Sequence, residues 1–280
     1  MIGLRPAPLR PLGVAEILDG AVRLLWRNAR AALAVSVPFA VVRAGLGAGV
    51  TYAALDSQDA LTLGTIGTLL LAITFGTLVA GLLAPMFSSD LLGTQIAARE
   101  SLRRVGRRVW GLIGLSVLVT VAEGAGLAAC VVGGVWMWGV WAVAAPALVL
   151  ERTGVGAALS RSMALVRGTF WRVWGIRALG WLLTSVLGGL LTLPFEALAS
   201  YVSNSDPFDQ SPSVTHPGAY VVILAVGGIL SAAVLQPVGA AIDVLRYTDL
   251  RMRKEGMDIV LGIPPAPGVV TPGRAAAPTW

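Results

Sequence analysis

The chain has 280 residues, of which 56% are apolar and only 13% charged, and its formal net charge is +6. An ordinary soluble domain carries about twice that charged fraction, so the composition argues against a soluble globular protein. The single cysteine excludes an intramolecular disulfide.

Six segments are long and apolar enough for transmembrane helices, which need about 20 such residues. They lie at about 31–55, 63–86, 109–129, 135–150, 173–201 and 220–244. We therefore expect an all-α, six-span membrane domain over residues 13–262, with a tight turn at Val132-Gly133-Gly134 between the third and fourth spans. An N-terminal tail over residues 1–12 and a disordered Pro/Ala-rich cytoplasmic tail over 263–280 flank it.

Nearly all cationic side chains lie on one side of these segments. They fall in the N-terminal segment, in the connections after the second and fourth spans and in the C-terminal segment, whereas the other connections carry none. Because basic residues in short loops resist translocation, both termini are expected in the cytoplasm. This placement accounts for the basic charge without nucleic acid. The strong preference for Arg over Lys suggests a bacterium, and so its cytoplasmic membrane.

Three connecting segments mix apolar and basic residues at helical spacing, namely Val14–Arg30, Gln95–Arg108 and Val155–Arg172. Such a pattern is typical of a helix lying in the headgroup plane, although a solvated helix or loop is the alternative. On the first interpretation, basic side chains contact anionic headgroups. The arginines expected to do so are Arg23, Arg27, Arg103, Arg104, Arg107, Arg108, Arg161, Arg167 and Arg172.

The sequence also suggests an internal repeat. The tetrapeptide Arg108–Gly111 recurs as Arg172–Gly175, each time at the start of an odd-numbered span, and Trp26-Arg27-Asn28 sits comparably before the first. In each even-numbered span a proline precedes a carboxylate by five or six residues. These pairs are Pro85 with Asp90, Pro146 with Glu151, and Pro237 with Asp243.

The repeated unit would be an interfacial helix followed by a transmembrane hairpin, and repeats of this kind are common in membrane bundles. Each proline would kink its helix and free a carbonyl. Each acid would lie close to the arginines of the next unit, as Asp90 to Arg99 or Glu151 to Arg152. The alternative is coincidence, because prolines are common in spans and charged residues at their ends.

Several stretches resemble the membrane-domain family of glycerophosphodiester phosphodiesterases, in particular its stand-alone actinobacterial members. They are Ala145–Glu151, Gly156–Ser162, Leu165–Ile176, Arg10–Gly20 and Tyr247–Asp258. The resemblance implies a membrane domain without the soluble phosphodiesterase domain to which it is fused in other members. It supplies no catalytic residue, and the sequence shows no catalytic constellation, metal site or cofactor motif of its own. We therefore do not expect an enzyme.

Three charged residues lie within the predicted spans and away from their cytoplasmic ends: Arg43 in the first, Glu123 in the third and Glu196 in the fifth. A lone charge at this depth is expensive, so we expect Arg43 to face the bundle and meet one of the two glutamates or water. One interpretation is an internal ion pair that fixes helix packing. The other is a polar cavity that accepts a headgroup or small amphiphile.

Two functions follow from these features. The first is a non-enzymatic accessory or scaffold protein in membrane-lipid or cell-envelope processes, holding anionic lipid and a protein partner. The alternative is a transporter or permease for a small amphiphilic or lipid-like molecule, with its cavity around Arg43.

Overall fold

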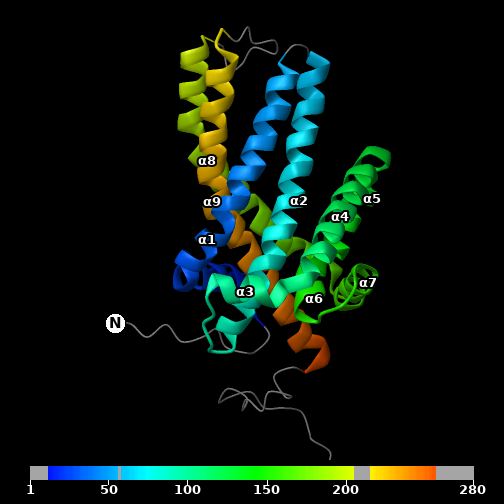
Figure 1. The fold of residues 1–280 in the computed structure, drawn as a ribbon. Helices are drawn as coiled ribbons and strands as arrows, with labels where there is room; N and C mark the ends of the chain where they lie inside the picture. The colour runs from blue at the N-terminus through cyan, green and yellow to red at the C-terminus, as the bar shows by residue number, and fades with distance from the viewer. Residues whose placement is uncertain (1–11, 56–57, 205–214, 257–280) are drawn as a thin grey trace, which may run out of the picture.

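The computed structural model describes residues 12–55, 58–204 and 215–256, except for the side chains of residues 58–61 and of Arg107. Every regular element in these ranges is a helix. Six are long and apolar enough to cross a membrane, which confirms the expected number (Figure 1). The expected N-terminal tail at 1–12 lies outside the described residues except for Leu12, which is buried, and the expected tail at 263–280 lies outside them.

Helix α1 (Val14–Ala54) joins the first expected interfacial segment and the first span in one element. The two parts meet at Asn28, whose φ/ψ of −113°/16° is not helical. The Asn28 side chain donates hydrogen bonds to the Leu24 carbonyl and, on another helix, to Asp90. The N-terminal part crosses one end of the bundle and the remainder rises along it (Figure 1).

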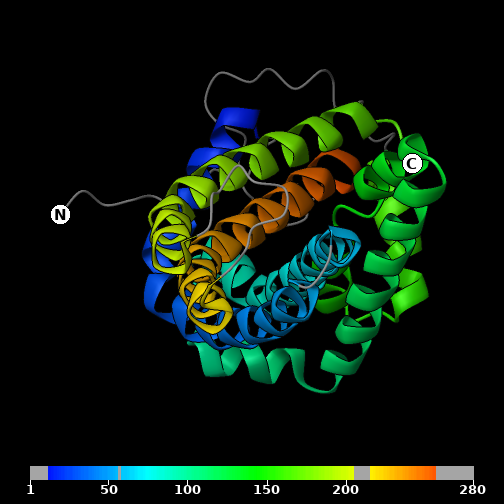
Figure 2. The ribbon, with the colours of Figure 1, turned by 90° about the horizontal axis from the view of Figure 1, so that it is seen from above.

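Helix α2 (Gln58–Leu91) returns to that end, where α3 (Ala98–Val105) and the short 3₁₀ helix η1 (Gly106–Arg108) follow. We call this the basic end, because most of the arginines gather there. The opposite end is called the far end. Two long hairpins reach it, α1–α2 and α8 (Phe170–Ser203) with α9 (Pro217–Glu255). Helix α9 packs between α1 and α8, and α2 packs between α1 and α4 (Figure 2).

Helices α4 (Val109–Ala129) and α5 (Val131–Val140) form the third, shorter hairpin. The expected turn at 132–134 is wrong, because the chain reverses at Cys130 and those three residues are helical. Gly134 is needed for close approach instead: a Cβ there would lie 2.7 Å from the backbone nitrogen of Leu127. Gly134 therefore lets the two helices pack closely and does not form the turn between them.

The fourth span is not continuous, contrary to expectation. It consists of α5 and α6 (Ala144–Leu150), with a turn over 141–143 between them. Broken helices at membrane depth are tolerated only where other groups satisfy the freed backbone. Here the Val140 carbonyl accepts a hydrogen bond from Ser162 at 2.7 Å, and the Ala142 carbonyl accepts one from Arg246 at 2.7 Å.

Ser162 lies on α7 (Val155–Val166), the third amphipathic segment. The tightest packing is at the basic end, where the fully buried Phe87, Leu148, Leu245 and Ile17 meet from α2, α6, α9 and the start of α1. In contrast, only 6% of the most apolar window of α8 is buried within the chain. Because lipid tails are as apolar as these side chains, the bilayer can cover such a face.

Candidate functional site

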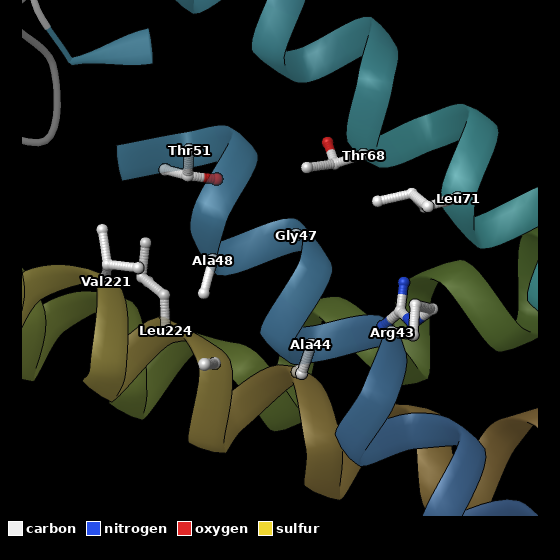
Figure 3. A pocket seen from close by; sticks show the side chains of 11 residues that line it. Arg43, Ala44, Gly47, Ala48, Thr51, Thr68, Leu71, Val221 and Leu224 are labelled. Atoms are coloured by element: carbon white, nitrogen blue, oxygen red, sulfur yellow. The ribbon is translucent and has the colours of Figure 1, made fainter. Parts of the chain in front are cut away.

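A pocket lined in part by Arg43 lies in the far half of the bundle, between α1, α2 and α9. Its volume is about 140 Å³, and small side chains line most of it. Figure 3 shows Arg43 towards one end and Thr51 towards the other. The full lining is Arg43, Ala44, Gly47, Ala48, Thr51, Thr68, Leu71, Val221, Leu224, Ala225 and Gly228.

The Arg43 guanidinium has no carboxylate partner among the described residues. Its Nε is buried and makes no hydrogen bond. The structure does not bring the expected Arg43, Glu123 and Glu196 together. Glu196 is an exposed residue of α8. Glu123 is only 2% exposed and has Arg177 of α8 as its ion-pair partner, at 4.0 Å. Arg43 therefore lines its pocket as an uncompensated cation.

A second polar cluster, which we call the helix-break network, lies where α5 gives way to α6. Arg177 donates to the Trp138 carbonyl and stacks over the Trp138 ring, 4.7 Å from its centroid. Arg246 of α9 donates to the Ala142 carbonyl and pairs with Asp243 on its own helix. Two arginines thus satisfy backbone groups of the interrupted helix.

Proline chemistry explains why Ala142 needs such a donor. Pro146 has no N–H to return to the carbonyl four residues before it, which is that of Ala142. The same holds at Pro237, where the freed Ala233 carbonyl accepts a hydrogen bond from Ser36 of α1 at 2.8 Å. Pro85 lies inside α2 and frees the Gly81 carbonyl. Two of the three expected prolines therefore free a carbonyl that bonds to a side chain from another element.

Arg246 is the most deeply buried arginine in the described chain, at 1% exposure. Only its Nη2 has partners, and its Nε and Nη1 are buried without one. The Asp243 side chain is 28% exposed, so one side of the pair borders accessible space. This pair is structurally coupled to the helix break.

Sequence reasoning missed Arg177 and Arg246 as site residues. Arg177 lies four positions inside the predicted fifth span. Because a charge inside a span is costly, this position alone indicated that Arg177 has a partner within the bundle. Asp243 and Arg246 are three apart and share a helix face. The sequence analysis considered Asp243 only as the acid that follows Pro237 in the suggested repeat.

The carboxylates at the basic end pair differently from expectation. Asp90 is fully buried and pairs with Arg27 at 2.8 Å, not with Arg99. Glu151 accepts from Arg161 and from the hydroxyl of Tyr247, not from Arg152. These partners lie farther away in the sequence than the expected arginines do, because segments distant in the chain meet at the basic end.

Arg161 lies between two carboxylates, Glu151 and Glu255. Partial burial alone lowers the pKa of Arg161. The hydrogen bonds that Arg161 donates to these carboxylates outweigh this effect and raise the pKa above its ordinary value. Arg161 therefore remains charged and joins α7 to the end of α9.

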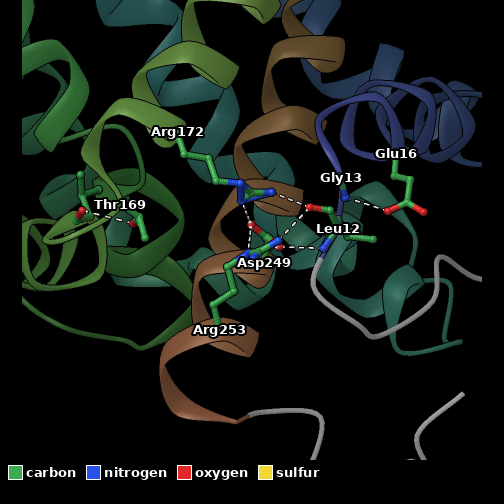
Figure 4. A network of polar contacts seen from close by, with 8 residues as sticks. Leu12, Gly13, Glu16, Thr169, Arg172, Asp249 and Arg253 are labelled. Carbon is green, nitrogen blue, oxygen red and sulfur yellow. Dashed lines mark hydrogen bonds and ion pairs between the residues drawn. The ribbon is translucent and has the colours of Figure 1, made fainter. Parts of the chain in front are cut away.

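Asp249 ties the N-terminal segment to the basic end (Figure 4). It is 1% exposed, accepts from the backbone N–H of Leu12 at 2.8 Å, and pairs with Arg172 and Arg253. Both arginines also donate to the Leu12 carbonyl. Both the N–H and the carbonyl of Leu12 are therefore hydrogen-bonded, although Leu12 and Asp249 are 237 positions apart in the sequence.

The arginines expected to contact lipid fall into two groups. Arg27, Arg161 and Arg172 are committed to the carboxylates described above, and Arg108 donates to the Arg152 carbonyl. Arg23, Arg103 and Arg104 pair with acids on their own helices and remain well exposed. Arg167 is exposed, and the side chain of Arg107 lies outside the described residues.

No group of three or more metal-binding side chains occurs in the part of the chain that the structure describes. Comparison of the chain with protein-family models, with curated proteins and with solved structures found no match.

Proposed function

We propose that this protein is a non-enzymatic permease that binds a small anionic amphiphile in the pocket at Arg43. The observation that carries the proposal is the unpaired Arg43 guanidinium, which lines an open pocket inside an apolar bundle. An isolated cation at membrane depth is costly and is retained mainly where it serves a pathway or ligand. An anionic headgroup would supply the missing charge.

The form of the pocket suits this ligand class. Small residues such as Gly47 and Ala48 leave room beside α1. Thr51 can donate a hydrogen bond to a ligand oxygen, whereas the Thr68 hydroxyl already donates to the Thr65 carbonyl at 2.9 Å. The volume of about 140 Å³ suits a headgroup rather than a whole lipid. Leu71, Val221 and Leu224 offer apolar surface for the start of a chain, so the pocket combines both properties of an amphiphile.

We place the protein in the bacterial cytoplasmic membrane, with its basic end and both termini in the cytoplasm. The distribution of arginines supports this orientation. So do Trp26, Trp110 and Trp171, which stand beside arginines at the basic end and are 75%, 76% and 78% exposed. Exposed tryptophans are enriched at the membrane–water interface.

We also infer that the bundle is built from three repeated units, as the tetrapeptide and the proline–acid pairs suggest. In each unit, the arginine at the start of the outgoing helix reaches the end of the returning one. The contacts are Arg27–Asp90 at 2.8 Å, Arg108 to the Arg152 carbonyl at 2.8 Å, and Arg172–Asp249 at 2.9 Å. In all three units an arginine joins these two positions, through a carboxylate in the first and third and a backbone carbonyl in the second, and this supports the repeat.

The test is binding of lysophosphatidylglycerol and lysophosphatidylcholine to the purified protein in detergent, followed by native mass spectrometry. We expect the wild type to retain the anionic lysolipid in preference to the zwitterionic one. Arg43→Gln should lower the ratio of anionic to zwitterionic lysolipid retained by about tenfold. Arg23→Gln is the matched control, because Arg23 is 54% exposed and remote from the pocket. An unchanged preference in Arg43→Gln refutes the proposal.

If Arg43 binds no ligand, its unpaired charge only destabilises the folded protein. Arg43→Met would then raise the midpoint of thermal unfolding and leave lysolipid retention as it was. Uptake of the same lysolipid into proteoliposomes separates a permease from a protein that only binds.

A scaffold for lipid or envelope processes is the second candidate. The observation that favours it is the long apolar face of α8, which includes the exposed Trp181, Leu182 and Leu190. Cross-linking in native membranes from position 182, followed by mass spectrometry, would identify a stoichiometric protein partner. Cross-links to lipid alone would remove this candidate.

A further inference from the structure

A second and larger pocket lies at the basic end, between α5, α7 and the start of α8. Its volume is about 530 Å³, and its walls are mainly apolar. We call it the α5–α7 groove. It is lined by Trp136, Val140, Ser160, Met163, Ala164, Val166, Arg167, Gly168 and Phe170.

We propose that the α5–α7 groove binds one acyl chain of an anionic phospholipid from the cytoplasmic leaflet, with the headgroup phosphate at Arg167. The site is separate from the Arg43 pocket and requires nothing of it.

The apolar part of the groove suits a chain. Trp136 and Met163 are 50% and 41% exposed, on opposite helices. Phe170 also lines the groove and packs on α5 so closely that a Cβ on Gly139 would approach its ring to 2.7 Å. Exposed apolar walls of this kind gain from contact with a hydrocarbon chain that fills the space between them.

One end of the groove is positively charged. Arg167 is exposed and has no ion pair among the described residues. Lys254 donates to the Ala164 carbonyl at 2.8 Å and to the Arg167 carbonyl, so a second cation stands at the same end of α7. Helix α8 begins at Phe170, and its N-terminus adds partial positive charge there.

The nearby carboxylates do not neutralise this end. Glu255 is held by Arg161 and Arg251, and Glu151 by Arg161 and Tyr247. The groove therefore combines an apolar trough with two cations at one end that no described carboxylate neutralises, an arrangement complementary to an anionic phospholipid. A neutral lipid would fill the trough but leave Arg167 without a partner.

Position in the bundle favours a phospholipid of this leaflet over a soluble anion. Trp171, the residue after Phe170, is 78% exposed, as expected at the membrane interface. The groove thus lies at the level of the headgroups, where each basic side chain near an anionic surface contributes about 1 kcal/mol.

The experiment uses the full chain in nanodiscs of phosphatidylcholine that contain a trace of phosphatidylglycerol with a photoreactive acyl chain. The same acyl probe on phosphatidylcholine is the reference. Cross-linked peptides are identified by mass spectrometry. We expect the anionic probe to label peptides that contain Trp136 or Met163 several times more than the reference probe does.

Two variants separate charge from shape. Arg167→Gln removes a side chain that makes no ion pair among the described residues, and should lower labelling by the anionic probe about fivefold. Ser160→Trp fills the groove, keeps the charges and should abolish labelling by both probes. Arg103→Gln, on the 79% exposed side chain of another helix, is the charge-matched control.

Equal labelling by both probes would overturn the proposal, as would equal losses in Arg167→Gln and Arg103→Gln. The first result would mean an unselective apolar trough, and the second only diffuse surface attraction. Competition by inorganic phosphate without the acyl chain would point to a soluble anion instead. Arg43→Gln should leave labelling unchanged, so failure here is distinguishable from failure of the permease.

Discussion

Arg246 offers the sharpest test of the helix-break network. In Arg246→Met the side chain keeps much of its length but loses its charge, its bond to the Ala142 carbonyl and its pairing with Asp243. Breaking a buried ion pair from one side costs about 3–5 kcal/mol, and an unsatisfied buried carbonyl about 1–3 kcal/mol. Because Asp243 is 28% exposed, solvent offsets part of this cost. We expect a loss of about 3 kcal/mol in the free energy of unfolding.

The double variant Asp243→Leu/Arg246→Met decides whether this cost comes from the uncompensated charge. Removing both charges leaves only the Ala142 carbonyl without a donor. The double variant should therefore lose about 1 kcal/mol, less than either single variant. Denaturant titration in dodecyl maltoside, followed by tryptophan fluorescence, measures all three. Arg23→Met, at an exposed site, is the control and should change stability by less than about 0.5 kcal/mol.

A double variant as unstable as the sum of the single variants would refute this reasoning. The two side chains would then contribute separately, and the pairing between them would have no energetic role.

Three further predictions concern packing and backbone satisfaction, each measured by the same titration. Asp249→Ala removes the acceptor of the Leu12 N–H and the carboxylate partner of two arginines, and should cost about 3 kcal/mol and open the N-terminal segment to limited proteolysis; unchanged protease resistance would contradict it. Ser36→Ala removes the donor to the carbonyl freed by Pro237 and should cost about 0.6–1 kcal/mol, whereas Ser36→Thr should retain most of the stability. Gly134→Val forces α4 and α5 apart and should cost about 2 kcal/mol, while Gly45→Val, with open space at its Cβ, should be nearly neutral.

Hydropathy predicted the six long helices because each crossing must supply its own run of apolar residues. The kink at Asn28 also falls close to the expected start of the first span at residue 31. The interruption at 141–143 was not predictable from these residues alone, since Trp141-Ala142-Val143 is as apolar as its surroundings. Donors from other helices stabilise it, and Pro146 was its only local signal.

The choice of partners for the charged side chains was the weakest part of the prediction. The similar depth of the two residues along their spans suggested Glu123 as a partner of Arg43. Depth, however, does not indicate which helices are neighbours. Helix α4 faces α8 through the Glu123–Arg177 pair, and α1 meets α2 and α9 around Arg43. Neighbour relations of this kind depend on the packing of the whole bundle.

The bond between Leu12 and Asp249 has a consequence for biosynthesis. Leu12 leaves the ribosome before any of the described helices, whereas its partner follows 237 positions later. The Leu12 backbone must therefore remain unpaired until α9 has been made. Arg246, which satisfies the Ala142 carbonyl, arrives equally late. Until then the Leu12 backbone and the Ala142 carbonyl lack these partners. Synthesis of α9 therefore completes the contacts that hold both the segment before α1 and the break between α5 and α6.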